Sequence, residues 1–108
     1  MSYKVELTPN FQKEAKRLVK KYHSLKSELV ALFNKLERNP SIGIPLGNDI
    51  YKIRLAVSSK RKGKSGGVRV ISYVQIDNTT VLLLSIYNKG EKESISDREI
   101  KDLIKKFS

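Results

Sequence analysis

The pattern of apolar and polar positions predicts a strand and then two helices in the first part of the chain. Residues 3–7 alternate aromatic or aliphatic side chains with charged ones, which is the period of a half-buried strand. From Phe11 to Tyr22 the apolar residues recur at helical spacing, and Thr8-Pro9 supply a capping side chain and a first-turn proline. The same spacing returns from Leu25 to Leu36 and ends at Asn39-Pro40. We therefore expect a strand followed by two helices in an antiparallel hairpin.

The rest of the chain has mainly the period of strands. Residues 41–49 are interrupted by Gly and Pro and are expected to be a loop. Alternating or β-branched runs over residues 51–57, 68–76 and 81–87 predict three strands, and the last run is apolar on both faces, so we expect it to lie centrally. Ser96 and Glu99 have capping-box spacing ahead of a short apolar helix. The expected fold class is α+β, in the order β-α-α-β-β-β-α, with a mainly antiparallel four-stranded sheet packed on helices.

The composition narrows the class of partner. The 108 residues suffice for one modest core, so we expect one domain over residues 1–108. Lys and Arg total 22 against 11 Asp and Glu, and the net charge of +11 favours a polyanion as partner. No segment has the pattern of an interfacial helix, a membrane span or a signal peptide, so nucleic acid is favoured over a membrane. The absence of Cys fits the cytoplasm, where we expect the protein.

The positive charge is concentrated in residues 50–76. This stretch contains seven Lys and Arg residues and no Asp or Glu, so its charges repel one another unless an anion is bound. Lys52 and Arg54 lie two positions apart on one strand face, and Arg69 belongs to the next strand. The remaining four fall between the two strands, where a solvated loop is the plain alternative to a phosphate-binding loop: Lys60, Arg61, Lys62 and Lys64.

The inventory of reactive residues limits the chemistry. The one histidine, His23, falls in the expected turn between the helices, no Cys is present, and no Asp, Glu or His group has metal-ligand spacing. We therefore expect no metal and no cofactor. RNA can be cleaved without either, because its 2′-hydroxyl can attack the neighbouring phosphorus while the protein moves protons and stabilises charge. Lys52, Arg54 and Arg69 are the candidates for this chemistry, and a solvated strand surface is the alternative.

Four further residues are candidates because of their position. Tyr73 and Tyr87 lie at or near strand ends, where stacking on bases competes with packing in the core or at the sheet edge. Lys89 and Lys92 follow the last expected strand, where a loop can reach the cationic surface or only solvent.

Three segments carry a resemblance to a known family: YKIRL at residues 51–55, KSGGVRVISY at residues 64–73 and SIYNKGEKESIS at residues 85–96. Together with the element order, they resemble the RelE/ParE superfamily of bacterial toxins, and the long KSGG hairpin is most similar to the second type of HigB toxin. The resemblance implies an endoribonuclease that enters the ribosomal A site, cleaves mRNA there without a metal and stops translation. It also implies a cognate antitoxin in a type II toxin–antitoxin module, with operator DNA bound only by the toxin–antitoxin complex.

The resemblance transfers the family's site residues to this chain only in part. The basic positions of two family strands fall on the three cationic candidates: Lys52, Arg54 and Arg69. The family's basic residue after the last strand falls at Gly90, which has lysines nearby on both sides. The tyrosine that one branch has before the last helix is replaced by Ser94-Ile95-Ser96, which leaves Tyr87 open as a substitute.

Two other functions fit a similar charge and fold. One is a gyrase-inhibiting toxin of the ParE type, which lacks this catalytic set, so Lys52, Arg54 and Arg69 together argue against it. The other is a non-catalytic module that binds RNA or the ribosome, and the sequence leaves this alternative open.

Overall fold

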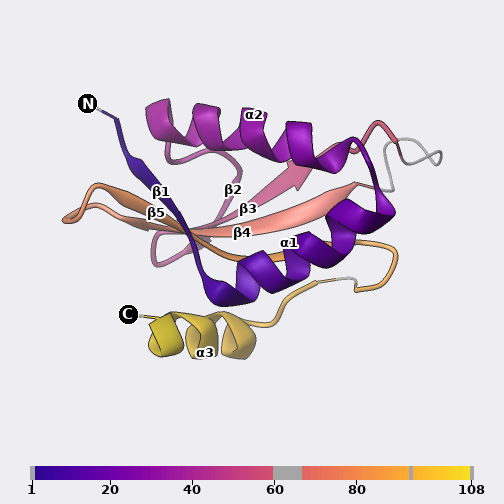
Figure 1. The fold of residues 1–108 in the computed structure, drawn as a ribbon. Coiled ribbons are helices and arrows are strands. Elements are labelled where there is room, and N and C mark those ends of the chain that lie inside the picture. The colour runs from indigo at the N-terminus through magenta and orange to yellow at the C-terminus, as the bar shows by residue number, and fades with distance from the viewer. Residues whose placement is uncertain (1, 60–66, 93, 108) are drawn as a thin grey trace.

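The computed structural model describes residues 2–59, 67–92 and 94–107 (Figure 1). Its elements are β1 (Lys4–Leu7), α1 (Pro9–Lys21), α2 (Leu25–Arg38), β2 (Ile44–Gly47), β3 (Ile50–Leu55), β4 (Val68–Gln75), β5 (Thr80–Asn88) and α3 (Asp97–Phe107). Within the described ranges the strands form one five-stranded sheet in the order β1-β5-β4-β3-β2. β1 pairs with β5 in parallel, and the other neighbours pair antiparallel. The α+β class is confirmed, but the sheet is mixed and has one strand more than expected.

The additional strand, β2, lies in the segment whose Gly and Pro residues predicted a loop. Ile44 pairs with Lys52 of β3, and the two strands are joined through Asn48 and Asp49, whose φ angles of 54° and 64° are those of a tight hairpin turn. All four β2 residues are exposed, so the strand has no alternation of apolar and polar positions. Its place at the sheet edge also tolerates Pro45. The prediction of a loop was wrong here because pairing with β3, and not burial, makes the strand.

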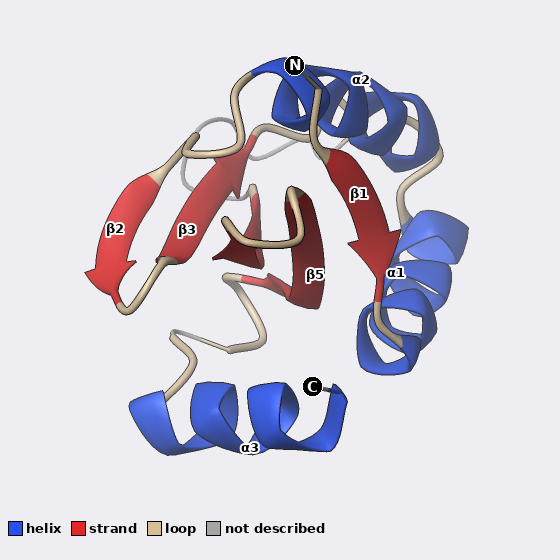
Figure 2. Ribbon diagram, turned by 90° about the vertical axis from the view of Figure 1, so that its left-hand side faces the viewer, coloured by secondary structure: helices blue, strands red, loops and turns tan. Residues whose placement is uncertain are grey.

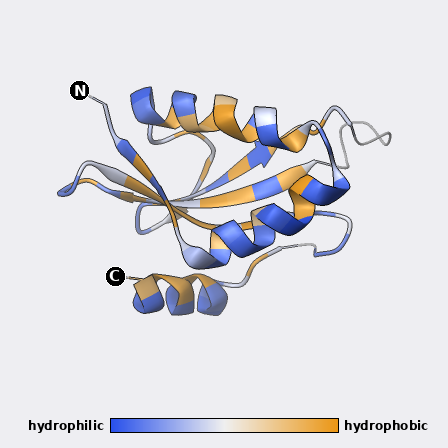
Figure 3. Cartoon of the chain, viewed as in Figure 1, coloured by the Kyte–Doolittle hydropathy of each residue, from blue (hydrophilic) through white to orange (hydrophobic). Residues whose placement is uncertain are grey.

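The sheet carries helices on both faces (Figure 1, Figure 2). α1 and α2 cover one face, where the larger apolar core includes Phe11, Leu36 and Leu83, all fully buried. α3 covers the other face through a smaller cluster that joins its buried Ile100 to residues such as Ile71. Figure 3 shows the apolar side of α3 turned towards the sheet and its charged side turned away. In the part of the chain described, no helix is both long and apolar enough to cross a membrane.

Both predicted helix caps are present. The Thr8 hydroxyl accepts a hydrogen bond from the Phe11 N–H at 3.2 Å and donates one to the Leu83 carbonyl at 2.8 Å, so the start of α1 is tied to β5. At α3, the Glu99 N–H donates to Ser96 Oγ at 3.1 Å and the Ser96 N–H donates to Glu99 Oε1 at 3.2 Å. This reciprocal pair is the predicted capping box, which fixes where α3 begins.

The edge of β5 beyond β1 is completed by side chains of α1. β1 stops at the pairing of Leu7 with Leu83, whereas β5 continues to Asn88. The Asn10 side chain donates to the Leu84 carbonyl at 2.9 Å, and Glu14 Oε1 accepts from the Ser85 hydroxyl at 2.8 Å and the Ile86 N–H at 3.3 Å. These contacts satisfy backbone groups that a strand would otherwise pair. All nine β5 residues are buried, and the predicted interior position of this strand is confirmed.

Candidate functional site

A row of three polar side chains crosses the sheet on the face that α3 covers. Arg54 of β3 is the register partner of Arg69 of β4, and Arg69 is the partner of Tyr87 of β5. Directly opposed residues of antiparallel strands point to the same face with Cβ atoms about 5 Å apart. Tyr87 belongs to the apolar cluster beneath α3, which places the row on that side of the sheet. We call Arg54, Arg69 and Tyr87 the polar row, and Lys52 points the same way from two residues before Arg54.

Arg69 is the most unusual member of the polar row. Its side chain is only 4% exposed, whereas Arg54 lies at the surface. The guanidinium donates from Nη1 to the Val68 carbonyl at 3.3 Å, but it takes part in none of the ion pairs formed within the described ranges. Burying a charge without a counterion costs several kcal/mol. A buried guanidinium without a carboxylate partner in the described ranges makes Arg69 a candidate anion-binding residue.

The backbone beside Arg69 leaves no room for a further side chain. A Cβ atom at Gly67 would lie 2.6 Å from the Leu55 carbonyl oxygen and 3.5 Å from Nη1 of Arg69. The first distance is shorter than packed atoms tolerate, so only glycine lets β3 and β4 approach this closely at the Arg69 end. Gly67 therefore helps to set the spacing between Arg54 and Arg69.

Tyr87 closes the polar row with a buried hydroxyl. The residue is 4% exposed, and its hydroxyl makes no hydrogen bond of good geometry among the described residues, although the Ile95 N–H lies near it. Burial raises the pKa of the Tyr87 hydroxyl above its ordinary value, while the positive charges of Arg69 and Lys92 oppose that shift. Tyr87 is therefore a protonated phenol at neutral pH, with a proton to give and two cations near it.

Asn88 shapes the connection from β5 to α3. Its carbonyl accepts hydrogen bonds from the N–H groups of Glu91 and Lys92, both at 2.9 Å, and its Oδ1 accepts from the Gly90 N–H at 3.1 Å. Its side-chain amide donates to the Tyr22 hydroxyl at 2.8 Å. Asn88 was not among the residues predicted from the sequence, although an Asn at a strand end two residues before a Gly is a turn signal. The effect of Asn88 is to direct Lys92 back towards the sheet.

Lys92 lies over the ring of Tyr87, with Nζ 5.8 Å from the ring centroid. The same ammonium forms an ion pair with Glu99 of α3, and its hydrogen bond to that carboxylate lowers the pKa of Glu99. Both side chains are partly exposed, at 37% and 48%. Lys92 is thus already paired with an acidic group of the protein.

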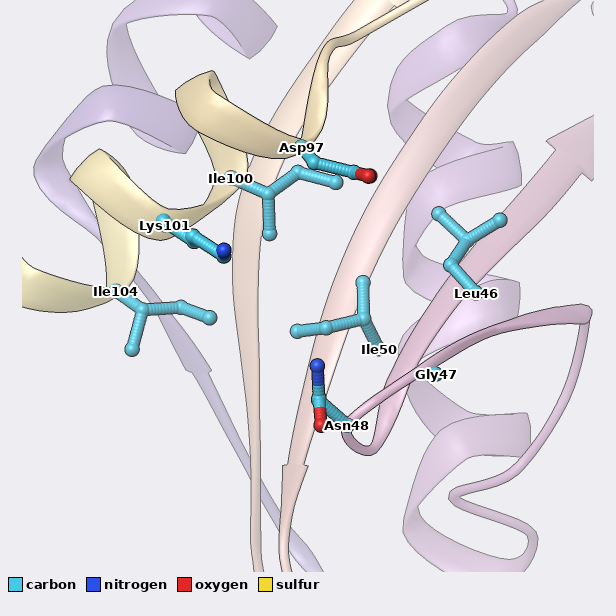
Figure 4. Close-up of a pocket in the computed structure, with 8 residues that line it drawn as sticks. All are labelled: Leu46, Gly47, Asn48, Ile50, Asp97, Ile100, Lys101 and Ile104. Atoms are coloured by element: carbon cyan, nitrogen blue, oxygen red, sulfur yellow. The ribbon is translucent and has the colours of Figure 1, made fainter.

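A cavity of about 160 Å³ lies beside the polar row and does not include it (Figure 4). It sits between the β2–β3 turn and α3 and is lined by Leu46, Gly47, Asn48, Ile50, Asp97, Ile100, Lys101 and Ile104. Ile50 is four residues before Arg54, which is roughly 13 Å along an extended strand. With one Lys and one Asp in its lining, this cavity lacks the excess of cations that a phosphate chain requires. The polar row, and not this cavity, is the candidate site.

Comparison with known proteins decides the family. The sequence model described as the RelE toxin of the RelE/RelB toxin–antitoxin system matches residues 4–108. This chain belongs to the RelE toxin family. The RelE-family chain is therefore a toxin of a toxin–antitoxin system, and the predicted superfamily is confirmed. Its similarity to the second type of HigB toxin stays a prediction.

Solved structures share the fold of this RelE-family toxin. A mutant of the Escherichia coli toxin RelE in the free state superposes with a TM-score of 0.67 at 19% identity, covering 100% of both chains. A chain of the intact E. coli RelBE toxin–antitoxin complex gives a TM-score of 0.60 at 20% identity, over 79% of this chain and 94% of that one. A chain of the RelBE2 toxin–antitoxin complex from Mycobacterium tuberculosis gives 0.60 at 19% identity, over 82% and 92%.

The structure places the predicted site residues of the RelE-family toxin in three groups. It brings five of them to one region of the sheet: Lys52, Arg54, Arg69, Tyr87 and Lys92. Tyr73 lies on the same face but is half-buried against the cluster beneath α3, and Lys89 is exposed. Four lie outside the described residues: Lys60, Arg61, Lys62 and Lys64. Among the residues described, no group of His, Asp and Glu has the arrangement of a metal site, and His23 is an exposed turn residue as expected.

Proposed function

We propose that this toxin cleaves mRNA in the ribosomal A site without a metal and thereby stops translation. The observation that carries the proposal is the buried guanidinium of Arg69, which has no carboxylate partner in the described ranges and lies in register with Arg54. An arginine presents a fixed fork of donors that fits two non-bridging phosphate oxygens. Those oxygens gain charge as the 2′-hydroxyl attacks the phosphorus, so a preorganised cation stabilises that state more than the ground state.

The other cations are given supporting roles in this proposal. Lys52 and Arg54, on the same face of β3, hold the RNA backbone on either side of the reacting phosphate. Lys89 and Lys92, in the connection after β5, contact the RNA strand. The segment containing Lys60, Arg61, Lys62 and Lys64 docks RNA or the ribosome, a role that rests on charge in the sequence alone. Tyr73 remains a candidate for stacking on a base.

We propose further that the toxin is neutralised by a cognate antitoxin in the cytoplasm. Support comes from the two similar structures that are toxin–antitoxin complexes. With a net charge of +11, the toxin favours an acidic segment in that partner. Operator DNA would then be bound only through the toxin–antitoxin complex.

Primer extension on mRNA in a translation extract tests the proposed function. With purified toxin, we expect cuts at codon-spaced positions that appear only when ribosomes are present and that persist in EDTA concentrations tolerated by the ribosome. Intact mRNA with arrested translation would instead support a non-catalytic ribosome binder. Unaffected translation together with trapped DNA breaks would support a gyrase-inhibiting toxin.

Binding of the toxin to single-stranded RNA is expected to weaken steeply with salt. Four described cations lie on or next to the candidate site, namely Lys52, Arg54, Arg69 and Lys92. If each contacts one phosphate, counterion release lowers the affinity roughly 50-fold between about 50 and 200 mM salt. Fluorescence anisotropy across a salt series measures this slope, and a flat response would exclude this surface as the RNA-binding one.

Glu99→Gln is expected to increase the affinity for RNA up to about fivefold. The change releases Lys92 from its ion pair, and exposed ion pairs are worth at most about 1 kcal/mol. Glutamine still completes the capping box with Ser96, so α3 keeps its start. The measurement is the same anisotropy titration at fixed salt.

Asp77→Asn is the matched control for Glu99→Gln, because it removes one negative charge from the exposed turn between β4 and β5. Equal gains in affinity for both variants would mean that net charge, and not release of Lys92, is responsible.

A further inference from the structure

The buried hydroxyl of Tyr87 is a polar group that the fold does not use. Tyr87 is 4% exposed, and its hydroxyl makes no hydrogen bond of good geometry within the described ranges; the Ile95 N–H lies near the oxygen, and no acceptor for the hydroxyl proton is found there. Leaving a buried hydroxyl unpaired costs about 1–3 kcal/mol, so a phenylalanine would serve the apolar cluster beneath α3 better. Packing in this cluster accounts for the aromatic ring of Tyr87, but it does not account for the presence of the hydroxyl group.

Three charged side chains face Tyr87 from the elements packed around it. Arg69 is its register partner on β4, Lys92 lies over its ring from the connection after β5, and Glu99 approaches from α3. Burial raises the pKa of the hydroxyl, which keeps it protonated at neutral pH. The two cations would stabilise a phenolate once the proton has left, because opposite charges within a few ångström favour the ionised form.

We propose that Tyr87 is the general acid of the cleavage reaction and protonates the 5′-oxygen of the leaving nucleotide. This inference rests on the proposed cleavage of mRNA. The 2′-oxygen forms a bond to phosphorus as its own proton passes to solvent water, and the bond between phosphorus and the 5′-oxygen breaks. The leaving oxygen takes the Tyr87 proton, which yields a 2′,3′-cyclic phosphate and a 5′-hydroxyl, and the phenolate then recovers a proton from water. No metal and no other reactant is needed for this balance.

The position of Tyr87 relative to Arg69 suits a site in which Arg69 binds the phosphate and Tyr87 donates the proton. The two residues are direct partners across β4 and β5, so their backbones are one strand spacing apart and their side chains start from the same face of the sheet. A phenol is a stronger acid than the sugar hydroxyl that leaves, so the proton transfer is downhill. The described residues supply no histidine on this face, since His23 lies in the turn between α1 and α2.

The cation over the Tyr87 ring is held by a weak contact. Lys92 lies over the ring and is held by the partly exposed ion pair with Glu99. Such a pair contributes at most about 1 kcal/mol, and an incoming phosphate can replace Glu99 as the counterion of Lys92. RNA binding can thus take Lys92 from Glu99 at little energetic cost and keep a cation beside the Tyr87 ring.

The first test compares Tyr87→Phe with Tyr51→Phe in ribosome-dependent cleavage of an mRNA with one preferred site. Tyr87→Phe keeps the ring and is expected to slow single-turnover cleavage by about 10²–10⁴-fold, the usual contribution of a general acid. Tyr51 lies on β3 and packs against the core on the opposite face, so Tyr51→Phe is expected to cleave at the wild-type rate. Thermal unfolding of both variants confirms that each is folded.

The second test uses an mRNA in which sulfur replaces the bridging 5′-oxygen at the cleavage site. A thiolate leaves without protonation, so Tyr87→Phe is expected to cleave this substrate within a few-fold of the wild-type rate. A Tyr87→Phe defect of equal size on both substrates would overturn the assignment and make Tyr87 a positioning residue. Wild-type rates for Tyr87→Phe on the natural mRNA would overturn it as well. Failure of the wild-type toxin to cleave either mRNA would instead contradict the proposed function itself.

Discussion

Arg69→Met lowers the rate of mRNA cleavage by about 10²–10³-fold while the protein stays folded. The loss of rate is expected because the buried guanidinium is the preorganised cation at the reacting phosphate, and removing one such donor typically has an effect of this size. Methionine matches the length of the lost side chain. Within the described ranges Arg69 has no counterion, and replacing a buried charge of that kind by an apolar group is neutral or stabilising, so the unfolding temperature should not fall. Single-turnover cleavage on programmed ribosomes and thermal unfolding measure the two effects.

Arg38→Met is the matched control for Arg69→Met. Arg38 is exposed in the last turn of α2, on the helical layer away from the polar row, and its replacement removes the same charge. We expect wild-type cleavage from this variant. Full activity in folded Arg69→Met, or an equal loss in both variants, would remove Arg69 from the site.

Gly67→Ala destabilises the fold by about 1–3 kcal/mol and lowers cleavage at the same time. The added methyl group meets the Leu55 carbonyl at 2.6 Å, and backbone atoms must move to relieve that contact. The shift separates β3 from β4 next to Arg69. Because misplacing a catalytic group by about 1 Å can cost up to about 10²-fold in rate, the activity of the remaining folded protein should fall as well. Urea unfolding measures the free energy of unfolding, and single-turnover cleavage at temperatures below the unfolding transition measures the rate.

Gly90→Ala provides the stability control. A Cβ atom at Gly90 meets only the Asn88 side chain at 3.5 Å, which is an ordinary contact. Its free energy of unfolding should stay within about 0.5 kcal/mol of the wild type. If Gly67→Ala were as stable as Gly90→Ala, the close approach of β3 and β4 at Gly67 would not be a constraint.

These two predictions separate chemistry from geometry within the polar row. Arg69→Met removes the charge and leaves the strands in place, whereas Gly67→Ala keeps the charge and moves the strands. The first variant should be inactive and stable, and the second should be less active and less stable. Agreement with both patterns would mean that the cation and its placement are each required.

Much of the fold followed from local patterns. The helical spacing of 11–22 and 25–36, the strand runs and the Ser96–Glu99 capping box all correspond to elements of the structure. These signals are readable because each depends on residues within one or two turns of each other. The same holds for Lys52 and Arg54, whose shared strand face follows from their spacing of two.

The short strand β2 and the parallel pairing of β1 with β5 were not predictable in this way. Neither has a local signature: β2 is wholly exposed, and the partner of β1 is about 75 residues further along the chain, with Val5 opposite Val81. Pairing between distant segments is decided by the burial and hydrogen bonding of the whole sheet, which no window of the sequence contains.

For the candidate site, too, some features followed from the sequence and others only from the tertiary structure. By itself the sequence determined which cations are available and predicted that Lys52, Arg54 and Arg69 lie on strands. Only the tertiary structure decided that Arg69 is buried without a carboxylate partner in the described ranges, that Tyr87 lies beside it, and that Lys92 is paired with Glu99. The reason is physical: charge and residue type are properties of the chain, whereas burial and counterions depend on the register between strands and on the packing of α3.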